Sequence, residues 1–368
     1  MKLVIFIGHF KTGSSSLQRF FCRNYVSLLN AGILYPSVES QGMSRNMAAL
    51  RQGHDFGNME VGLNISEPHN ALALRLKNEE DGHDVPGYYP NLPSGFQMFE
   101  NLQAQIAALS PNVVILCSEV FALFGLTAEL KSIKRIANRF SQHDVTIYCN
   151  LRRPDHHISS WHRQRLKFGE KLAPLRQDAF RHYLATAHFK QDEMIQGWKD
   201  HFPNGKLVVR NFADVKSAGG SVADFMTHCG AEFPEGLENP GDFNLSVPSA
   251  FAEIGRLALH ELGQERGCAL VSWLIAASSY VDHVKESDVE MFGSINRELI
   301  ANNFSQTHEK ISEIAGVDQF YSDIESFAQQ RSVSDVDAAR AALPGLRAHA
   351  KNSQLAEDLI SWLEDLDF

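Results

Sequence analysis

The sequence has few cysteines, no long apolar run and no excess of basic residues. Its five cysteines form no Cys-x-x-Cys pair, so neither a zinc site nor a disulfide framework is expected, and a reducing, cytoplasmic location fits best. No run approaches the roughly 18 apolar residues that span a bilayer, and the apolar N-terminal stretch is too short for a signal peptide. The net charge of −10 argues against a general binder of nucleic acid or anionic membranes.

The composition is otherwise that of a globular protein. Hydrophobic residues make up 44% of the 368 residues and charged residues 21%, which is enough apolar material for a sizeable core. The length permits two domains or one large α/β domain. An anionic ligand of such an acidic chain must therefore be held by a local basic site.

Four apolar segments rich in β-branched residues have the character of buried strands. They are residues 3–7, 113–117, 145–149 and 207–209. Helical patterns lie between them, and strands that alternate with helices indicate a parallel sheet with ligand loops at the carboxyl ends of its strands. The predicted fold is therefore α/β, a three-layer parallel β-sheet flanked by helices, with the first strand near its centre.

The chain divides by pattern into an α/β core and a helical region. Residues 1–248 form the core, within which residues 37–95 are rich in Gly, Asn, Pro and His with little periodicity. So long a weakly structured stretch predicts a lid or a substrate-binding insertion. Residues 249–368 are expected to be helical and to pack on the core, and the apolar stripe at residues 355–366 is interpreted as core packing.

A phosphate-binding loop is predicted directly after the first strand. Its sequence is Gly8-His9-Phe10-Lys11-Thr12-Gly13-Ser14-Ser15-Ser16, and a helix pattern follows. Backbone N–H groups and the positive end of that helix attract phosphate. The NTPase pattern places Lys directly after the second Gly, whereas here Lys11 lies two residues before Gly13. The loop therefore lacks the magnesium-binding arrangement of a nucleoside-triphosphatase.

A second anion motif follows the third strand. It has Arg152 at the strand end, Pro154 two residues on, and Ser160 eight residues after the arginine. A guanidinium and a hydroxyl from the next helix suit a dianionic phosphate. Arg153 is interpreted either as a further phosphate contact or as solvent-facing.

Together the two motifs resemble those of sulfotransferases that use 3′-phosphoadenosine 5′-phosphosulfate (PAPS), bacterial-type members above all. The resemblance covers roughly residues 1 to 245 and implies a P-loop NTPase-like sulfotransferase fold. It implies that Lys11 stabilises the leaving 3′-phosphoadenosine 5′-phosphate (PAP) during in-line transfer of a sulfonate group. The loop residues that would hold the 5′-phosphate and sulfonate are Thr12, Gly13, Ser14, Ser15 and Ser16, and those for the 3′-phosphate are Arg152 and Ser160. No metal is required.

An acceptor hydroxyl needs a general base, for which Glu119 is the first candidate. It follows the second strand, which is expected to lie beside the phosphate loop, and the alternative is a structural partner of Lys11 or Arg152. His9 is interpreted as a basic or core residue rather than a catalytic one. Weaker candidates for the base are His54, Asp55 and His69 in the insertion.

The acceptor is expected to be a carbohydrate, a lipid headgroup or a small metabolite. Tyr88, Tyr89 and Phe96 are candidates to line its site, and the basic, aromatic residues 161–167 are either a ligand contact or a solvated helix face. The partners excluded are nucleic acid and an integral membrane span, while an oligomer stays open. Two alternatives to a sulfotransferase are a metal-dependent P-loop kinase with a divergent loop and a non-catalytic nucleotide-binding protein of the same fold.

Overall fold

The computed structural model describes residues 1–55, 61–127, 130–239, 241 and 246–368. The chain divides into two compact units. The α/β unit comprises Met1–Arg153, Lys190–Phe243 and Lys310–Phe320, and the helical unit comprises Pro154–Phe189, Asn244–Glu309 and Tyr321–Phe368. The division differs from the predicted boundary after residue 248, because residues 154–189 group with the C-terminal helices.

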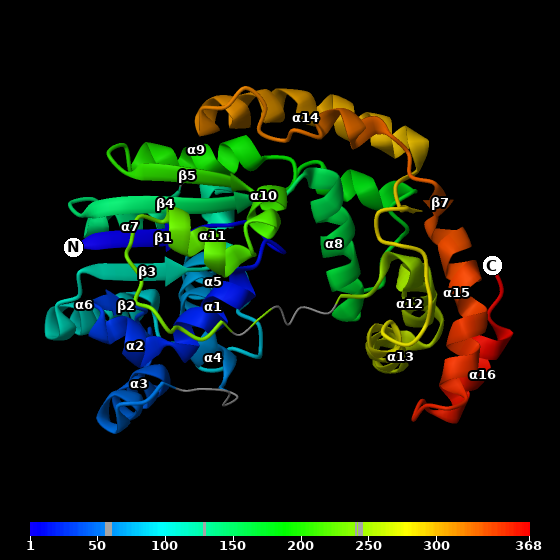
Figure 1. The fold of residues 1–368 in the computed structure, drawn as a ribbon, viewed down its shortest axis with the longest axis horizontal. Helices are drawn as coiled ribbons and strands as arrows, with labels where there is room; N and C mark the ends of the chain where they lie inside the picture. The colour runs from blue at the N-terminus through cyan, green and yellow to red at the C-terminus, as the bar shows by residue number, and fades with distance from the viewer. Residues whose placement is uncertain (56–60, 128–129, 240, 242–245) are drawn as a thin grey trace. The chain divides into compact units, whose positions relative to one another are not determined.

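A five-stranded parallel sheet forms the centre of the α/β unit (Figure 1). The strand order is β2-β3-β1-β4-β5, and the strands are β1 (Lys2–Phe6), β2 (Ile33–Leu34), β3 (Val113–Cys117), β4 (Asp144–Leu151) and β5 (Lys206–Asn211). All four pairings are parallel, and Phe6 of β1 is in register with Cys117 on one side and Tyr148 on the other. The predicted parallel α/β sheet, with the first strand between two others, is confirmed. The sequence did not predict β2, a two-residue edge strand.

Helices flank this sheet. They are α1 (Ser14–Arg23), α2 (Tyr25–Asn30), α3 (Ser40–Gln52), α4 (Leu63–Ser66), α5 (Pro68–Asp81), α6 (Gly95–Leu109), the 3-10 helix η1 (Val120–Leu126), α7 (Lys131–Phe140), α9 (Gln191–His201), α10 (Phe212–Ser217) and α11 (Ser221–His228). The insertion at residues 37–95 is therefore helical over much of its described length, and the interpretation as a weakly structured stretch is wrong. The periodicity is weak because α5 buries consecutive residues, Pro68 to Ala73, rather than one stripe.

Aromatic side chains beneath the phosphate loop hold α1 against the sheet. Phe6 of β1 stacks on Tyr148 of β4 with ring centroids 5.9 Å apart, and Phe225 of α11 lies 4.9 Å from Tyr148 and 5.4 Å from Phe21 of α1. All four side chains are buried. The loop between β1 and α1 thus starts and ends on elements that the core fixes.

The helical unit contains most of the C-terminal helices and one short pair of strands. Its elements are α8 (Pro154–Lys167), η2 (Asp178–Tyr183), η3 (Ser249–Phe251), α12 (Ala252–Glu261), α13 (Gly263–Ala277), β6 (Val289–Glu290), η4 (Ile324–Ala328), β7 (Val333–Ser334), α15 (Asp335–Ala350) and α16 (Glu357–Asp365), and α14 (Gly293–Ala315) has residues in both units. Leu359 and Leu363 of α16 are buried, as the apolar stripe predicted.

Candidate functional site

The loop from β1 to α1 has an unusual backbone conformation. Lys11 has a φ of 60° and Gly13 a φ of 88°, both in the left-handed region that side chains rarely adopt. A Cβ atom at Gly13 would overlap the hydroxyl of Ser221 on α11, so only glycine fits. With these two positive φ angles, the residues between β1 and α1 form a tight loop rather than part of a helix or a strand.

Thr12 is the internal anchor of this loop. Its hydroxyl donates to the carbonyl of His9, and its own carbonyl accepts from Asn150 Nδ2 at 3.3 Å and from Ser221 Oγ at 3.1 Å. The side chain is completely buried. The Thr12 hydroxyl proton is therefore used within the loop. The donor that Thr12 could offer to a ligand is its backbone N–H.

The first turn of α1 has the character of an anion site. Its N-cap residue is Gly13, which has no side chain to cap the turn, and no acidic residue lies in the turn. Ser14 and Ser16 are buried there, and Ser15 is half-buried. Backbone N–H groups, hydroxyls and the positive end of the helix dipole favour a phosphate or sulfonate at this position.

Glu119 lies beside this turn. The backbone of β3 continues next to β1, because the Ser118 N–H donates to the Phe6 carbonyl at 3.2 Å. The Glu119 carboxyl then accepts a hydrogen bond through Oε1 from Asn70 Nδ2 at 3.3 Å. Its other oxygen, Oε2, is buried and has no hydrogen-bond partner among the described residues. Burial and the nearby charge of Glu67 raise the pKa of Glu119 to about 7.

The sequence analysis missed Glu67 and Asn70, which the insertion brings to Glu119. Glu67 immediately precedes α5 and Asn70 lies in its first turn. The two residues are linked to each other at 2.9 Å, and the Glu67 carboxylate also accepts from the Tyr89 hydroxyl at 3.0 Å. No local pattern marks them, since Asn70 and Glu119 are 49 positions apart. The available signal was only that polar residues of the insertion had to meet some partner.

Arg152 follows β4, whose carboxyl end lies next to that of β1. The His9 N–H donates to the Asn150 carbonyl at 2.9 Å, which keeps the two strand ends side by side. The Arg152 guanidinium lies 5.8 Å from the centre of the Phe212 ring. The backbone carbonyl of Arg152 accepts a hydrogen bond from Gln191 Nε2 at 3.0 Å. The α/β unit thus brings the phosphate loop, Glu119 and Arg152 to one edge of the sheet. Arg153 is only 6% exposed, so the solvent-facing interpretation is wrong.

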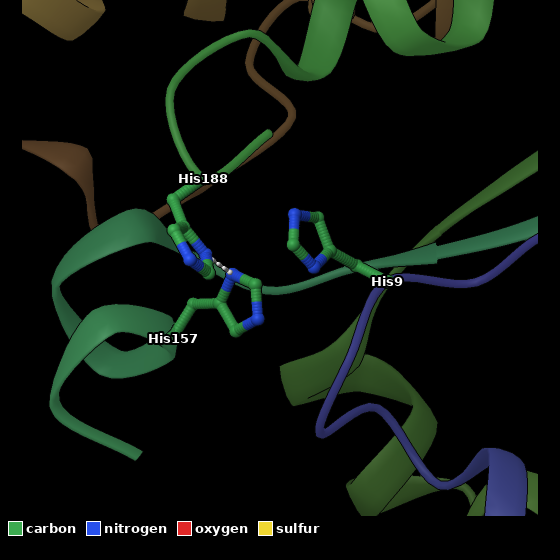
Figure 2. Close-up of side chains that lie close together, drawn as sticks. All are labelled: His9, His157 and His188. Carbon is green, nitrogen blue, oxygen red and sulfur yellow. Dashed lines mark hydrogen bonds between the residues drawn. The ribbon is translucent and has the colours of Figure 1, made fainter. Parts of the chain in front are cut away.

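Ser160 belongs to the helical unit, so it lies in a different unit from the other predicted site residues. It is buried on α8, one turn after His157. Within this unit Nδ1 of His157 lies 3.0 Å from Nδ1 of His188. Figure 2 shows the hydrogen bond between the two rings. One of these nitrogens carries the proton of that hydrogen bond and the other accepts it. The predicted role of Ser160 at the 3′-phosphate stays a prediction.

In the basic stretch at residues 161–167, two arginines form hydrogen bonds and ion pairs with other residues of the helical unit. Arg163 is buried and donates to the Val247 carbonyl at 2.7 Å and to Glu286 at 3.0 Å. Arg165 donates to Glu170 at 2.7 Å and to the Tyr183 hydroxyl at 3.0 Å. Both cations therefore form hydrogen bonds within the helical unit, and the interpretation of a solvated face is wrong for the buried Arg163.

Two of the weaker base candidates, Asp55 and His69, have structural roles. Asp55 accepts hydrogen bonds from the N–H groups of Val26, at 2.6 Å, and Ser27, so it caps the N-terminus of α2. His69 is fully buried, its Nδ1 accepts from the Cys117 N–H at 3.1 Å, and burial lowers its pKa to about 3. His9 is buried, in line with its predicted core role, and His54 is exposed.

The predicted acceptor residues differ in exposure. Tyr88 and Phe96 are 62% and 61% exposed, whereas Tyr89 is buried and its ring lies 5.2 Å from that of Tyr88. Among the described residues, the helices include none with the length and apolar character to cross a bilayer.

The fold defines a class of protein, an α/β protein with a parallel sheet and an anion-type loop at the carboxyl end of its central strand. Comparison with family models, with curated proteins and with solved structures yields no match.

Proposed function

We propose that the chain is a sulfotransferase, which moves a sulfonate group from PAPS to an acceptor hydroxyl. The observation that carries the proposal is the place of Glu119: it follows β3 directly beside the end of β1, where the loop into α1 begins, and its half-buried carboxyl group is suited to accept a proton. General bases work best with a pKa near the working pH, and burial raises the pKa of Glu119 to about 7. An anion site with a base beside it is what transfer of an anionic group to a hydroxyl requires.

In the proposed reaction the oxygen of the acceptor hydroxyl forms a bond to sulfur, and Glu119 accepts the proton of that hydroxyl. The bond between sulfur and the bridging oxygen of the donor breaks at the same step. Lys11 and the N–H groups of the first turn of α1 neutralise the charge that develops on this oxygen. Arg152 and Ser160 would hold the 3′-phosphate. No metal takes part, because Lys11 stands before Gly13 and not after it, where a kinase lysine and its magnesium-binding hydroxyl would lie.

The acceptor is proposed to be a carbohydrate, a lipid headgroup or a small metabolite. Exposed Tyr88 lies next to Tyr89, whose hydroxyl binds the Glu67 carboxylate, so an aromatic surface and two carboxylates occur together on the insertion side of Glu119. Aromatic faces and carboxylates are groups to which sugars and polyols bind through stacking and hydroxyl donors.

The test is a thermal-shift comparison of PAP, PAPS and ATP with magnesium. A ligand at 100 times its dissociation constant adds about 2.7 kcal/mol of stability. We expect PAP to raise the melting temperature without any metal, and the effect to be lost in Arg152→Ala and kept in the matched control Lys134→Ala, an exposed lysine on α7. A shift only with ATP and magnesium would establish the kinase instead.

Turnover then separates an enzyme from a non-catalytic binder. Release of PAP from PAPS is measured over a panel of sugars, lipids and small alcohols. Lys11→Ala is expected to lower the rate about 10²–10³-fold, as loss of one preorganised donor does. Glu119→Gln is expected to keep PAP affinity and lose turnover. Binding of PAP with no turnover of any acceptor would identify a non-catalytic nucleotide-binding protein.

A further inference from the structure

Two carboxyl groups of the α/β unit share one amide. Asn70 Nδ2 donates to Glu67 Oε2 at 2.9 Å and to Glu119 Oε1 at 3.3 Å, and Asn70 Oδ1 accepts from Ser118 Oγ at 2.6 Å. The Tyr89 hydroxyl donates to the same oxygen of Glu67 at 3.0 Å. Asn70 is buried, and Glu67 and Glu119 are half-buried. The amide and the phenol thus fix the Glu67 carboxylate at a short distance from Glu119.

We propose that Glu67 is a positioning residue for Glu119: it holds a second negative charge against this carboxyl group and so sets the pH range in which Glu119 accepts a proton. The inference rests on the proposed function only in giving Glu119 the role of base. The coupling itself is a property of the two carboxyl groups. It assigns a chemical task to the insertion, which delivers Glu67, Asn70 and Tyr89.

Among the titratable groups described around Glu119, the carboxyl group of Glu67 is the one that brings a negative charge near pH 7. Cys117, Tyr88 and Tyr89 also face the carboxyl pair, and burial raises the pKa of each of them, so all three are neutral near pH 7. The Ser14 hydroxyl and the Asn70 amide favour the charged form of Glu119, because both lower its pKa. Lys11 is the cation of the adjoining loop. A like charge within a few ångströms favours the protonated form of a carboxyl group, and this is the direction in which Glu67 acts on Glu119.

Glu67→Gln tests the proposal, because it removes the charge and keeps the shape. We expect the acidic limb of the kcat profile to move to lower pH by about one unit, with the KM for PAPS unchanged. Glu67→Asp keeps the charge and is expected to keep the wild-type limb. Glu100→Gln on α6 removes an equal but exposed charge and serves as the matched control. Glu67→Ser is a second neutral variant for the case that Gln does not fold, since serine is a favoured residue before a helix.

A second readout does not depend on sulfonate transfer. Carbon-13 NMR of labelled glutamate carboxyls follows the titration of Glu119, assigned as the signal that Glu119→Gln removes. The midpoint is expected near pH 7 in the wild-type chain and about one unit lower in the neutral variants. An unchanged midpoint in both neutral variants, or an equal shift in Glu100→Gln, overturns the proposal even if the chain transfers sulfonate. A lowered midpoint without transfer supports the carboxyl coupling while the proposed function fails.

Discussion

At the scale of single residues, the loop from Gly8 to Ser16 combines residues that fix its backbone conformation with a residue, Lys11, that carries a charge. Thr12 and Gly13 hold the shape, one through hydrogen bonds to its own loop and to α11, the other through a conformation and a space that exclude a side chain. Lys11 offers charge from a left-handed backbone. Substitutions at residues that fix the backbone conformation are expected to lower the free energy of unfolding, because they strain the folded state.

Gly13→Ala is expected to destabilise the chain by roughly 2–4 kcal/mol, from left-handed strain and from overlap with Ser221. Gly53→Ala is the matched control, because Gly53 also has a positive φ, 70°, but open space around it. It isolates the backbone cost, about 1–2 kcal/mol. Urea unfolding measures both variants. Equal losses would show that the contact with Ser221 contributes nothing.

At the scale of elements, buried charges hold the start of α8. Arg297 of α14 donates to Asp155, in the first turn of α8, at 2.7 Å and to Glu290 of β6 at 3.0 Å. All three side chains are at most 2% exposed. A buried ion pair adds little net stability by itself, yet removing one partner leaves charges buried without compensation. The element that carries Ser160 therefore depends on an arginine 142 positions from Asp155.

Arg297→Met is expected to lower the free energy of unfolding by about 3–5 kcal/mol. The exposed pair of Arg340 with Asp337 provides the control, since Arg340→Met is expected to cost at most about 1 kcal/mol. Denaturant unfolding followed by circular dichroism measures both. A loss for Arg297→Met as small as the control value would mean that Asp155 and Glu290 are solvated.

The sequence predicted the elements that have local signals and missed those without them. Uninterrupted apolar runs with β-branched residues identified β1, β3 and β4, because a strand buried on both faces needs such residues along its whole length. The run at residues 207–209 also marks a strand, β5, but this edge strand is only partly buried, so its prediction as a buried strand is wrong. The short edge strand β2 and the pair β6–β7 have only two residues each, too few for any pattern. In the insertion, consecutive residues of α5 are buried, so its sequence does not show the single apolar stripe that predicts a helix.

At the scale of the whole molecule, each unit contains a buried neutral histidine. His69 lies in the α/β unit and His162 in the helical unit, and burial lowers the pKa of each to about 3. The unfolded chain binds a proton on each near pH 6.5, so it holds more protons than the folded chain below that pH. Their contribution to stability is therefore present above pH 6.5 and is lost as the pH falls toward 3.

We expect acid to destabilise the chain by about 1.4 kcal/mol per pH unit for each of these histidines. Glu119 and Asp335 act in the opposite direction, because burial raises their pKa values to about 7 and about 6. Comparison of variants separates the two effects. His69→Gln is expected to make the loss between pH 7 and pH 5 shallower, and the exposed His54→Gln to leave it unchanged. Urea unfolding at several pH values measures the slopes, and equal slopes would contradict a neutral buried His69.

The sequence by itself determined the sheet-forming strands and the loop from Gly8 to Ser16, because apolar runs and glycine conformations are encoded over a few neighbouring residues. Only the tertiary structure decided which polar residues meet: it brought Asn70, together with Glu67, to Glu119, and it placed Arg163 and Arg165 in ion pairs. Hydrogen bonds and charges act over a few ångströms in space, and folding brings together groups that lie far apart in the chain.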